Sequence, residues 1–239
     1  MNILIPMAGL GQRFKKEGYD VPKFLIDIFG KSMIERSIES FNTIDAQFIF
    51  ITLGIDAVIR NLLETICDNP IIVNINEVTD GPVRSCLLAK EFINSHEELL
   101  IANCDQILFW NFENFLHYAR NPRIDGVIVT YESDTPKNSY ARLDKGGRVL
   151  EVKEKEVISN VSLNGVHYWK CGKYFVDSAT EMIRNKDTAP NGEYYVGPTY
   201  NYLVDDMYIV TYHIAKEQHH AVGTPDDLRK FLEVYDGII

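Results

Sequence analysis

The feature that most constrains the fold is an alternation of short apolar runs with segments of helical periodicity. Continuous apolar runs bounded by turn residues are typical of strands buried on both faces, as in a parallel sheet. Between them, apolar residues recur at the spacing of one helix face. The runs occupy residues 3–5, 47–53, 71–75, 99–102 and 126–131, and the helical segments occupy residues 31–41, 56–67, 81–94 and 111–120. This order predicts an α/β domain with a mainly parallel central sheet flanked by helices.

The pattern changes after residue 131. Shorter strands are expected at residues 140–143, 148–153 and 166–170, with a hairpin turn at residues 144–147. A helix over 171–184, a strand over 207–214 and a closing helix over 224–235 follow, the last capped by Thr224. We therefore predict a single domain, residues 1–239, with two functional halves, 1–131 and 132–239. The second half is expected to form a smaller antiparallel region on the same sheet.

Composition and charge exclude some classes of function. A chain with 46% hydrophobic and 24% charged residues fits an ordinary globular protein. The net charge of −10 argues against a nucleic-acid binder, because such a protein needs a basic face. No signal-peptide pattern and no run long enough to span a bilayer is visible, so we expect a cytoplasmic protein without membrane insertion. The four scattered cysteines are expected to be reduced and near the core.

Small and basic residues follow the first strand. Gly9 and Gly11 can bring bare N–H groups close to a ligand. Arg13 and Lys23 place two cations near the same loop. The loop predicts a nucleoside triphosphate site made by the backbone of four residues, Ala8, Gly9, Leu10 and Gly11. The alternative is an ordinary strand–loop connection with two exposed basic residues.

Two further strand ends support the triphosphate site. The turn at Gly81 follows the third predicted strand, and Asp105 follows the fourth. In parallel sheets, ligands bind beyond the carboxyl ends of the strands. The topology could therefore bring Gly81, Asp105 and the glycine loop together.

The pattern Gly9-x-Gly11-x-Arg13-Phe14, followed by Pro22-Lys23, resembles the signature of sugar-phosphate nucleotidylyltransferases, also called NDP-sugar pyrophosphorylases. Weaker matches continue at residues 105, 154–155, 159–166 and 223–225, and the variant is similar to proteins of capsule and surface-polysaccharide biosynthesis. The resemblance implies a Rossmann-like (GT-A-like) sheet, with a nucleotide-binding half at 1–131 and an acceptor-binding half at 132–239. It also admits a homo-oligomer.

The reaction implied by the resemblance joins an NTP to a phosphorylated sugar or polyol and releases pyrophosphate. Arg13 would hold the pyrophosphate and Lys23 the α-phosphate and acceptor phosphate. Asp105 would bind Mg²⁺ or Mn²⁺, since these cations prefer carboxylate and phosphate oxygens. Gly81 would take part in reading the base. The acceptor would contact five residues, Glu154, Lys155, Asn160, Gly165 and Glu193.

The chain departs from this family near its end. Ala221 stands where many members have a second metal-binding aspartate, so that ligand is absent, supplied by water, or replaced by His219 or His220. In a strand, the two histidines point to opposite faces, and at most one can face the site. Residues 151–156 also fit a solvated run of mixed charge. The competing functions are a GT-A-type glycosyltransferase using a nucleotide-sugar donor, and a non-catalytic sugar-nucleotide sensor.

Overall fold

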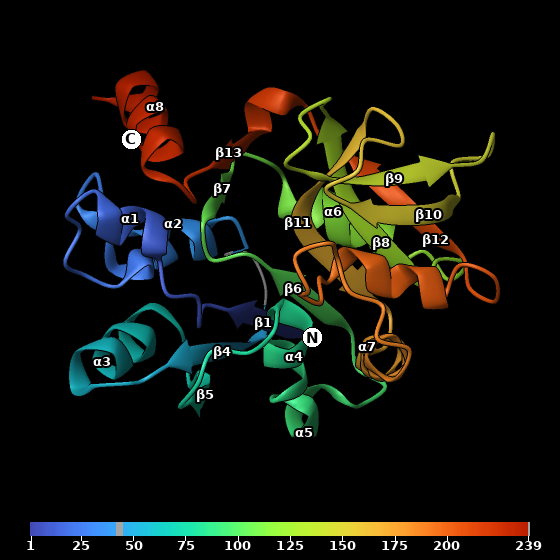
Figure 1. Ribbon diagram of the computed structural model, residues 1–239, viewed down its shortest axis with the longest axis horizontal. Helices are drawn as coiled ribbons and strands as arrows, with labels where there is room; N and C mark the ends of the chain where they lie inside the picture. Colours follow the sequence, from blue (N-terminus) through green and yellow to red (C-terminus); the bar gives the residue numbers. More distant parts are fainter. Residues whose placement is uncertain (42–44, 239) are drawn as a thin grey trace.

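The computed structural model describes residues 1–41 and 45–238. A nine-stranded sheet runs through it (Figure 1). Its parallel part has the order β6-β1-β4-β5. These strands are β1 (Asn2–Pro6), β4 (Gln47–Leu53), β5 (Ile71–Ile75) and β6 (Leu99–Ala102). The predicted parallel core is therefore confirmed for four of the five early strands.

The other strands extend the sheet beyond β6. The long strand β11 (Val161–Trp169) pairs antiparallel with β6 and with β8 (Gly126–Glu132). The predicted fifth strand, 126–131, therefore joins the sheet through β11 and lies outside the parallel core. The remaining members are β9 (Ser139–Leu143), β10 (Val149–Glu154) and β12 (Ile209–His213), of which β12 runs parallel to β8.

Helices cover both faces of the sheet because the central strands are apolar on both sides. In β1, Leu4 packs into one buried cluster and Ile3 and Ile5 into the other. The Leu4 side is covered by α4 (Pro82–Leu87), α5 (Lys90–Ile93) and α7 (Gly172–Arg184). The opposite side is covered by α2 (Met33–Glu39), α3 (Ala57–Ile66) and α6 (Phe112–Ala119). This layering confirms the predicted α/β class.

Local capping explains where several helices begin. The side chain of Ser32 accepts from the N–H of Glu35 and forms a capping box at the start of α2. The predicted caps Asp56 and Thr224 are confirmed for α3 and for α8 (Pro225–Tyr235). The predicted helix over 81–94 is divided into α4 and α5, because the backbone leaves the helical path near Ala89 (φ −90°, ψ 12°).

Several short elements near the site lack a clear period and were not predicted. They are α1 (Gln12–Lys16), β2 (Asp27–Ile28), β3 (Lys31–Ser32), β7 (Gln106–Leu108), β13 (His219–Ala221) and the 3-10 helices at Lys23–Leu25, Gly197–Tyr202 and Lys216–Gln218. The antiparallel pair β13–β7 brings residues 219–222 close to the carboxyl end of β6. There, the Val222 N–H donates to Asp105 O (2.9 Å).

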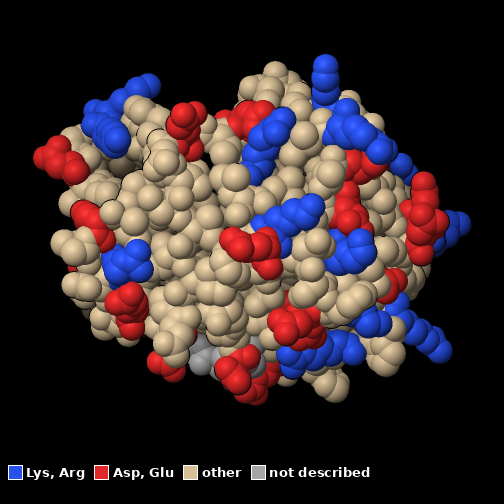
Figure 2. All heavy atoms as spheres, turned by 90° about the horizontal axis from the view of Figure 1, so that it is seen from below, with Lys and Arg blue, Asp and Glu red and all other residues tan. Residues whose placement is uncertain are grey.

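The surface carries charges of both signs. On the face that Figure 2 shows, the basic and acidic side chains of the described residues are interspersed. No helix in the described ranges is long and apolar enough to cross a membrane.

Candidate active site

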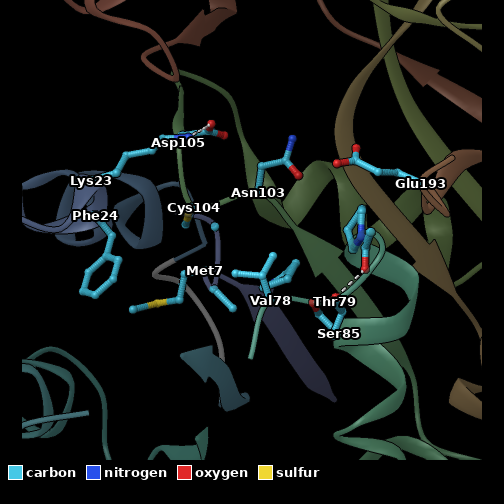
Figure 3. Close-up of a pocket in the computed structure, with 15 residues that line it drawn as sticks. Met7, Lys23, Phe24, Val78, Thr79, Ser85, Asn103, Cys104, Asp105 and Glu193 are labelled. Carbon is cyan, nitrogen blue, oxygen red and sulfur yellow. Dashed lines mark hydrogen bonds and ion pairs between the residues drawn. The ribbon is translucent and has the colours of Figure 1, made fainter. Parts of the chain in front are cut away.

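A cavity of about 310 Å³ opens at the carboxyl ends of the parallel strands. We call it the β1 cavity; its walls come from residues 6–9, 23–24, 78–79, 81–82 and 103–105, and from Ser85 and Glu193 (Figure 3). Its position agrees with the general rule for ligands of parallel sheets. Of the predicted triphosphate loop, Ala8 and Gly9 line the cavity, and so does Gly81.

Lys23 and Asp105 form an ion pair in the wall of this cavity. The Lys23 ammonium donates to Asp105 Oδ2 (Figure 3). Burial would raise the pKa of the Asp105 carboxyl, but the charge and hydrogen bond of Lys23 hold it below its ordinary value. Burial lowers the pKa of Lys23, and Asp105 more than reverses this, so that the pKa is raised. Both groups are therefore charged at neutral pH.

Two glycines allow this pair to form. Gly11 has a left-handed backbone (φ +61°), and a Cβ there would lie 3.1 Å from Lys23 Cβ. A Cβ on Gly223 would lie 2.4 Å from Asp105 Oδ2 and 3.6 Å from Lys23 Nζ. Residues from opposite ends of the chain thus leave room for the same two side chains.

A second cavity of about 320 Å³ adjoins the first. We call it the β11 cavity, because Leu163, Asn164, Gly165 and His167 form one wall. The other walls include Lys137, Glu154, Tyr195, His219, Ala221 and Gly223. Asn103, Asp105 and Pro82 line both cavities. Asp105 therefore lies at the junction of the two cavities, and Lys23 is paired with it in the wall of the β1 cavity.

Glycine again sets the geometry of the shared wall. A Cβ on Gly165 (φ +94°) would lie 2.1 Å from Asn103 Nδ2, so only glycine lets Asn103 rest against β11. On the far wall, Glu154 accepts a hydrogen bond from Ser139. Burial raises the pKa of Glu154, although that hydrogen bond acts in the opposite direction.

One loop contributes to both cavities. The backbone of Tyr194 pairs with the start of α4, since its N–H donates to Asp80 O (2.9 Å) and its carbonyl accepts from Val83 N–H (3.1 Å). This pairing places Glu193 in the β1 cavity and Tyr195 in the β11 cavity.

The structure places other predicted residues outside the two cavities. Arg13 is exposed on α1, where its charge still acts on Lys23. Leu10 is 43% exposed. Asn160 turns to Glu132, to whose Oε1 its amide donates (3.2 Å). The roles assigned to these residues stay predictions.

Lys155 also lies outside both cavities. Its backbone is left-handed (φ +56°), and its ammonium donates to the Tyr195 hydroxyl (2.7 Å). The ammonium lies 4.6 Å from the centre of that ring. Lys155 thereby lines a different cavity, on the other side of Tyr195.

The two histidines separate as strand alternation predicts. His219 lines the β11 cavity together with Ala221, and its ring lies 4.4 Å from that of Tyr131. His220 packs among aromatic side chains instead, and its Nε2 lies 2.9 Å from the Tyr235 hydroxyl. Burial lowers the pKa of His219 to about 4, so its imidazole is neutral at neutral pH.

The donor set of the site suits a hard cation shared with a substrate. Among residues 1–41 and 45–238, no three His, Cys, Asp or Glu side chains gather into a group that could hold a metal. Mg²⁺ needs only one or two protein carboxylates when phosphates supply the rest. Asp105 already binds a cationic group, the Lys23 ammonium, and its carboxylate fits this requirement.

Sequence reasoning missed several lining residues. Asn103 and Gln106 flank Asp105 at a strand end, and that position was a usable signal. Asn164 and His167 lie inside an apolar strand, where the sequence gives no sign that they face a cavity. Thr79 and Ser85, whose hydroxyl oxygens lie 2.6 Å apart in the β1 cavity, sit beside the recognised Gly81 turn.

Comparison with known proteins now decides the family. The MobA-like NTP transferase domain matches residues 3–161. The chain belongs to this family. The predicted relation to sugar-phosphate nucleotidylyltransferases is confirmed, and so is the class of enzyme.

Two relatives of this NTP transferase domain protein share about a quarter of their aligned residues with it. It is 28% identical to the bifunctional protein GlmU of Aquifex aeolicus over 93% of this chain and 50% of GlmU. It is 25% identical to the choline-phosphate cytidylyltransferase of Haemophilus influenzae over 71% of this chain and 69% of the relative. The chain thus spans half the length of GlmU.

Solved structures show the same fold. The nucleoside-diphosphate-sugar pyrophosphorylase of Vibrio cholerae superposes with a TM-score of 0.77 at 23% identity. The match covers 97% of this chain and 99% of that one.

Proposed function

We propose that this protein is a nucleotidylyltransferase that joins an NTP to a phosphorylated sugar or polyol and releases pyrophosphate. The observation that carries the proposal is the pair of cavities that meet at Lys23 and Asp105. The β1 cavity would hold the nucleotide and the β11 cavity the acceptor. The family and the fold support this division.

The proposed reaction forms a bond from an acceptor phosphate oxygen to the α-phosphorus and breaks the bond to the β-phosphate. The acceptor phosphate is already an anion, so no base is required. The protein must hold two anions together and stabilise the charge of the transition state. Lys23 would turn from Asp105 to the phosphates, and backbone N–H groups at Ala8 and Gly9 would support the nucleotide.

A divalent cation, Mg²⁺ or Mn²⁺, would supply charge neutralisation when held by Asp105 and the phosphates. His219 is a candidate for a second protein contact, because it lines the same cavity as Asp105 while Ala221 offers no donor. Arg13 would need a side-chain movement to reach the pyrophosphate. We retain capsule or surface-polysaccharide synthesis in the cytoplasm as the proposed setting, on the resemblance of the opening motif.

Pyrophosphate release tests the proposal. CTP, UTP, dTTP, GTP and ATP are each paired with glucose 1-phosphate, other sugar phosphates, glycerol 3-phosphate and phosphocholine. We expect release with one preferred pair, and no release without a divalent metal. Transfer from a nucleotide sugar without pyrophosphate would instead show a glycosyltransferase, and tight binding without turnover would show a sensor.

Variants at the junction sharpen this test. Lys23→Ala and Asp105→Asn are each expected to lower kcat by about a hundredfold or more, because each removes charge from the reacting centre. Thermal unfolding should change by only a few degrees, since both side chains are partly exposed at the cavity wall. Lys16→Ala, an exposed lysine of α1, is the matched control. Normal turnover in Lys23→Ala would exclude the assignment.

A further inference from the structure

Three buried side-chain nitrogens in the wall of the β11 cavity have no hydrogen-bond partner within the described parts of the chain. They are Gln106 Nε2, Asn164 Nδ2 and His167 Nδ1. The three residues are only 2%, 4% and 5% exposed, respectively. Buried polar groups are nearly always paired, because an unpaired one costs free energy. Seven buried side-chain atoms of the described residues lack a partner, and three of the seven belong to residues that line this one cavity. This concentration favours a ligand that pairs with them.

The local backbone brings two of these side chains to the same cavity. In a regular strand, residues 164 and 167 would face opposite sides of the sheet. Here Leu163 pairs with Thr130 and His167 with Ile128, so four steps along β11 match two steps along β8. This bulge, with Gly165 in its middle, turns both side chains to the β11 cavity.

The chemistry of the free groups is that of neutral donors and acceptors. The carbonyl oxygen of the Asn164 amide accepts from Val166 N–H (2.9 Å), which leaves its NH₂ group free to donate. The ring of His167 lies beside those of Trp169 and Tyr200, with centroids 6.1 and 5.9 Å apart. Burial lowers the pKa of His167 to about 3, so the imidazole is neutral and carries one donor and one acceptor.

We propose that His167, together with Gln106 and Asn164, binds hydroxyl groups of the acceptor and makes the β11 cavity specific for polyhydroxylated phosphate esters. The proposal rests on the nucleotidylyltransferase function and names the residues that select its acceptor. His167 and Gln106 are specificity-determining residues in this scheme.

A quaternary ammonium ester, such as phosphocholine, fits these walls poorly. Its methyl groups neither donate nor accept hydrogen bonds, so all three nitrogens would stay unpaired. Both carboxylates of the cavity are engaged, Asp105 with Lys23 and Glu154 with Ser139. Lys137 adds a positive charge to the lining. The two tyrosine rings of the lining are also engaged, Tyr131 with the ring of His219 (4.4 Å between centroids) and Tyr195 with the Lys155 ammonium (4.6 Å). The cavity is therefore better suited to hydroxyl groups than to a quaternary ammonium, which would need free carboxylates and open aromatic faces.

The test measures stability and specificity in the same variants. His167→Phe and Gln106→Leu replace an unpaired buried group with an apolar one of similar size. Without ligand, we expect the melting temperature to stay the same or rise, because an unpaired polar group has been removed. With the preferred hydroxylated acceptor, we expect its KM to rise about ten- to a hundredfold, with kcat at saturation and the KM for NTP little changed.

Tyr200→Phe is the matched control. Its ring neighbours His167, but its hydroxyl is already paired with the carbonyls of Tyr168 (3.0 Å) and Val127 (3.3 Å). We expect the opposite pattern, a lower melting temperature and an unchanged acceptor KM.

Two results would overturn the inference. A marked fall in the melting temperature of unliganded His167→Phe would show that the histidine is structural. Wild-type turnover of phosphocholine in preference to sugar and polyol phosphates would show that the cavity does not select hydroxyls. If the wild type releases no pyrophosphate with any acceptor, the proposed function is contradicted instead. The melting temperature of His167→Phe would still test whether His167 is structural.

Discussion

Gly223 shows how the absence of one side chain can set the position of another residue's carboxylate. Its hypothetical Cβ overlaps Asp105 Oδ2 at 2.4 Å, and its backbone is not in the left-handed region. An added methyl group would therefore displace the carboxylate without straining the main chain. The absence of a side chain at residue 223 therefore matters for the position of the Asp105 carboxylate and little for the stability of the fold.

We expect Gly223→Ala to lower kcat by about a hundredfold, because a displacement of about 1 Å at a reacting centre has an effect of this size. The melting temperature should change little. Gly146→Ala is the matched control, since its Cβ would lie 3.3 Å from another aspartate, Asp144, in the β9–β10 turn. Steady-state kinetics and thermal unfolding measure both effects. Equal activity of the two variants would contradict this account of residue 223.

At the scale of the elements, backbone hydrogen bonds join the loop around Tyr194 to the start of α4. Gly81 has φ +125°, and a Cβ there would lie 2.4 Å from Tyr194 N and 2.6 Å from Tyr194 O. Because these are backbone atoms, they cannot step aside as a side chain can. The segment that carries Glu193 and Tyr195 would have to move as a unit.

Gly81→Ala should therefore raise the KM of both substrates and lower the free energy of unfolding by about 1–3 kcal/mol. Gly192→Ala separates the two causes, because Gly192 also has positive φ (+80°) but nothing lies within 4 Å of its Cβ position. It should lose stability with little effect on either KM. If only one KM changes in Gly81→Ala, the loop does not couple the cavities.

The elements also show which features local sequence could reveal. The parallel strands and the caps Asp56 and Thr224 follow from short-range periodicity and side-chain chemistry. The position of Asp105 follows from the convergence of strand ends in such sheets, whereas the role predicted for Lys23 rests on the Pro22-Lys23 pair of the motif that resembles the nucleotidylyltransferase signature. The β13–β7 pair forms between segments that are far apart in the sequence. The bulge in β11 has no clear sequence signal, so the direction of the His167 side chain could not be predicted. The hydrogen bond from the Lys155 ammonium to the Tyr195 hydroxyl likewise joins two segments that lie far apart in the sequence.

For the whole molecule, buried neutral histidines predict how stability depends on pH. Burial lowers the pKa of His167 to about 3 and of His219 to about 4, from an ordinary value of 6.5. Below pH 6.5, the unfolded chain binds protons that the folded chain does not. The stability that these two histidines contribute is therefore fully present above pH 6.5 and is lost as the pH decreases toward the folded pKa values.

We expect His167 alone to contribute about 1.4 kcal/mol per pH unit to this fall between about pH 6 and pH 5. Denaturant unfolding of wild type and His167→Phe across this range measures it. The variant should show a shallower slope, by about one proton. Identical slopes would mean that His167 takes up a proton in the folded protein.

The residues shared by the two cavities would also affect how fast the product of the proposed reaction is released. Asn103, Asp105 and Pro82 face both cavities, so one continuous surface would hold a molecule that fills both. The nucleoside-diphosphate product of the proposed reaction is such a molecule, and its two ends are tethered at a high effective concentration. Release, rather than bond making, would then limit turnover. A stable compound that links nucleoside and sugar through the same spacing would compete with both substrates at once.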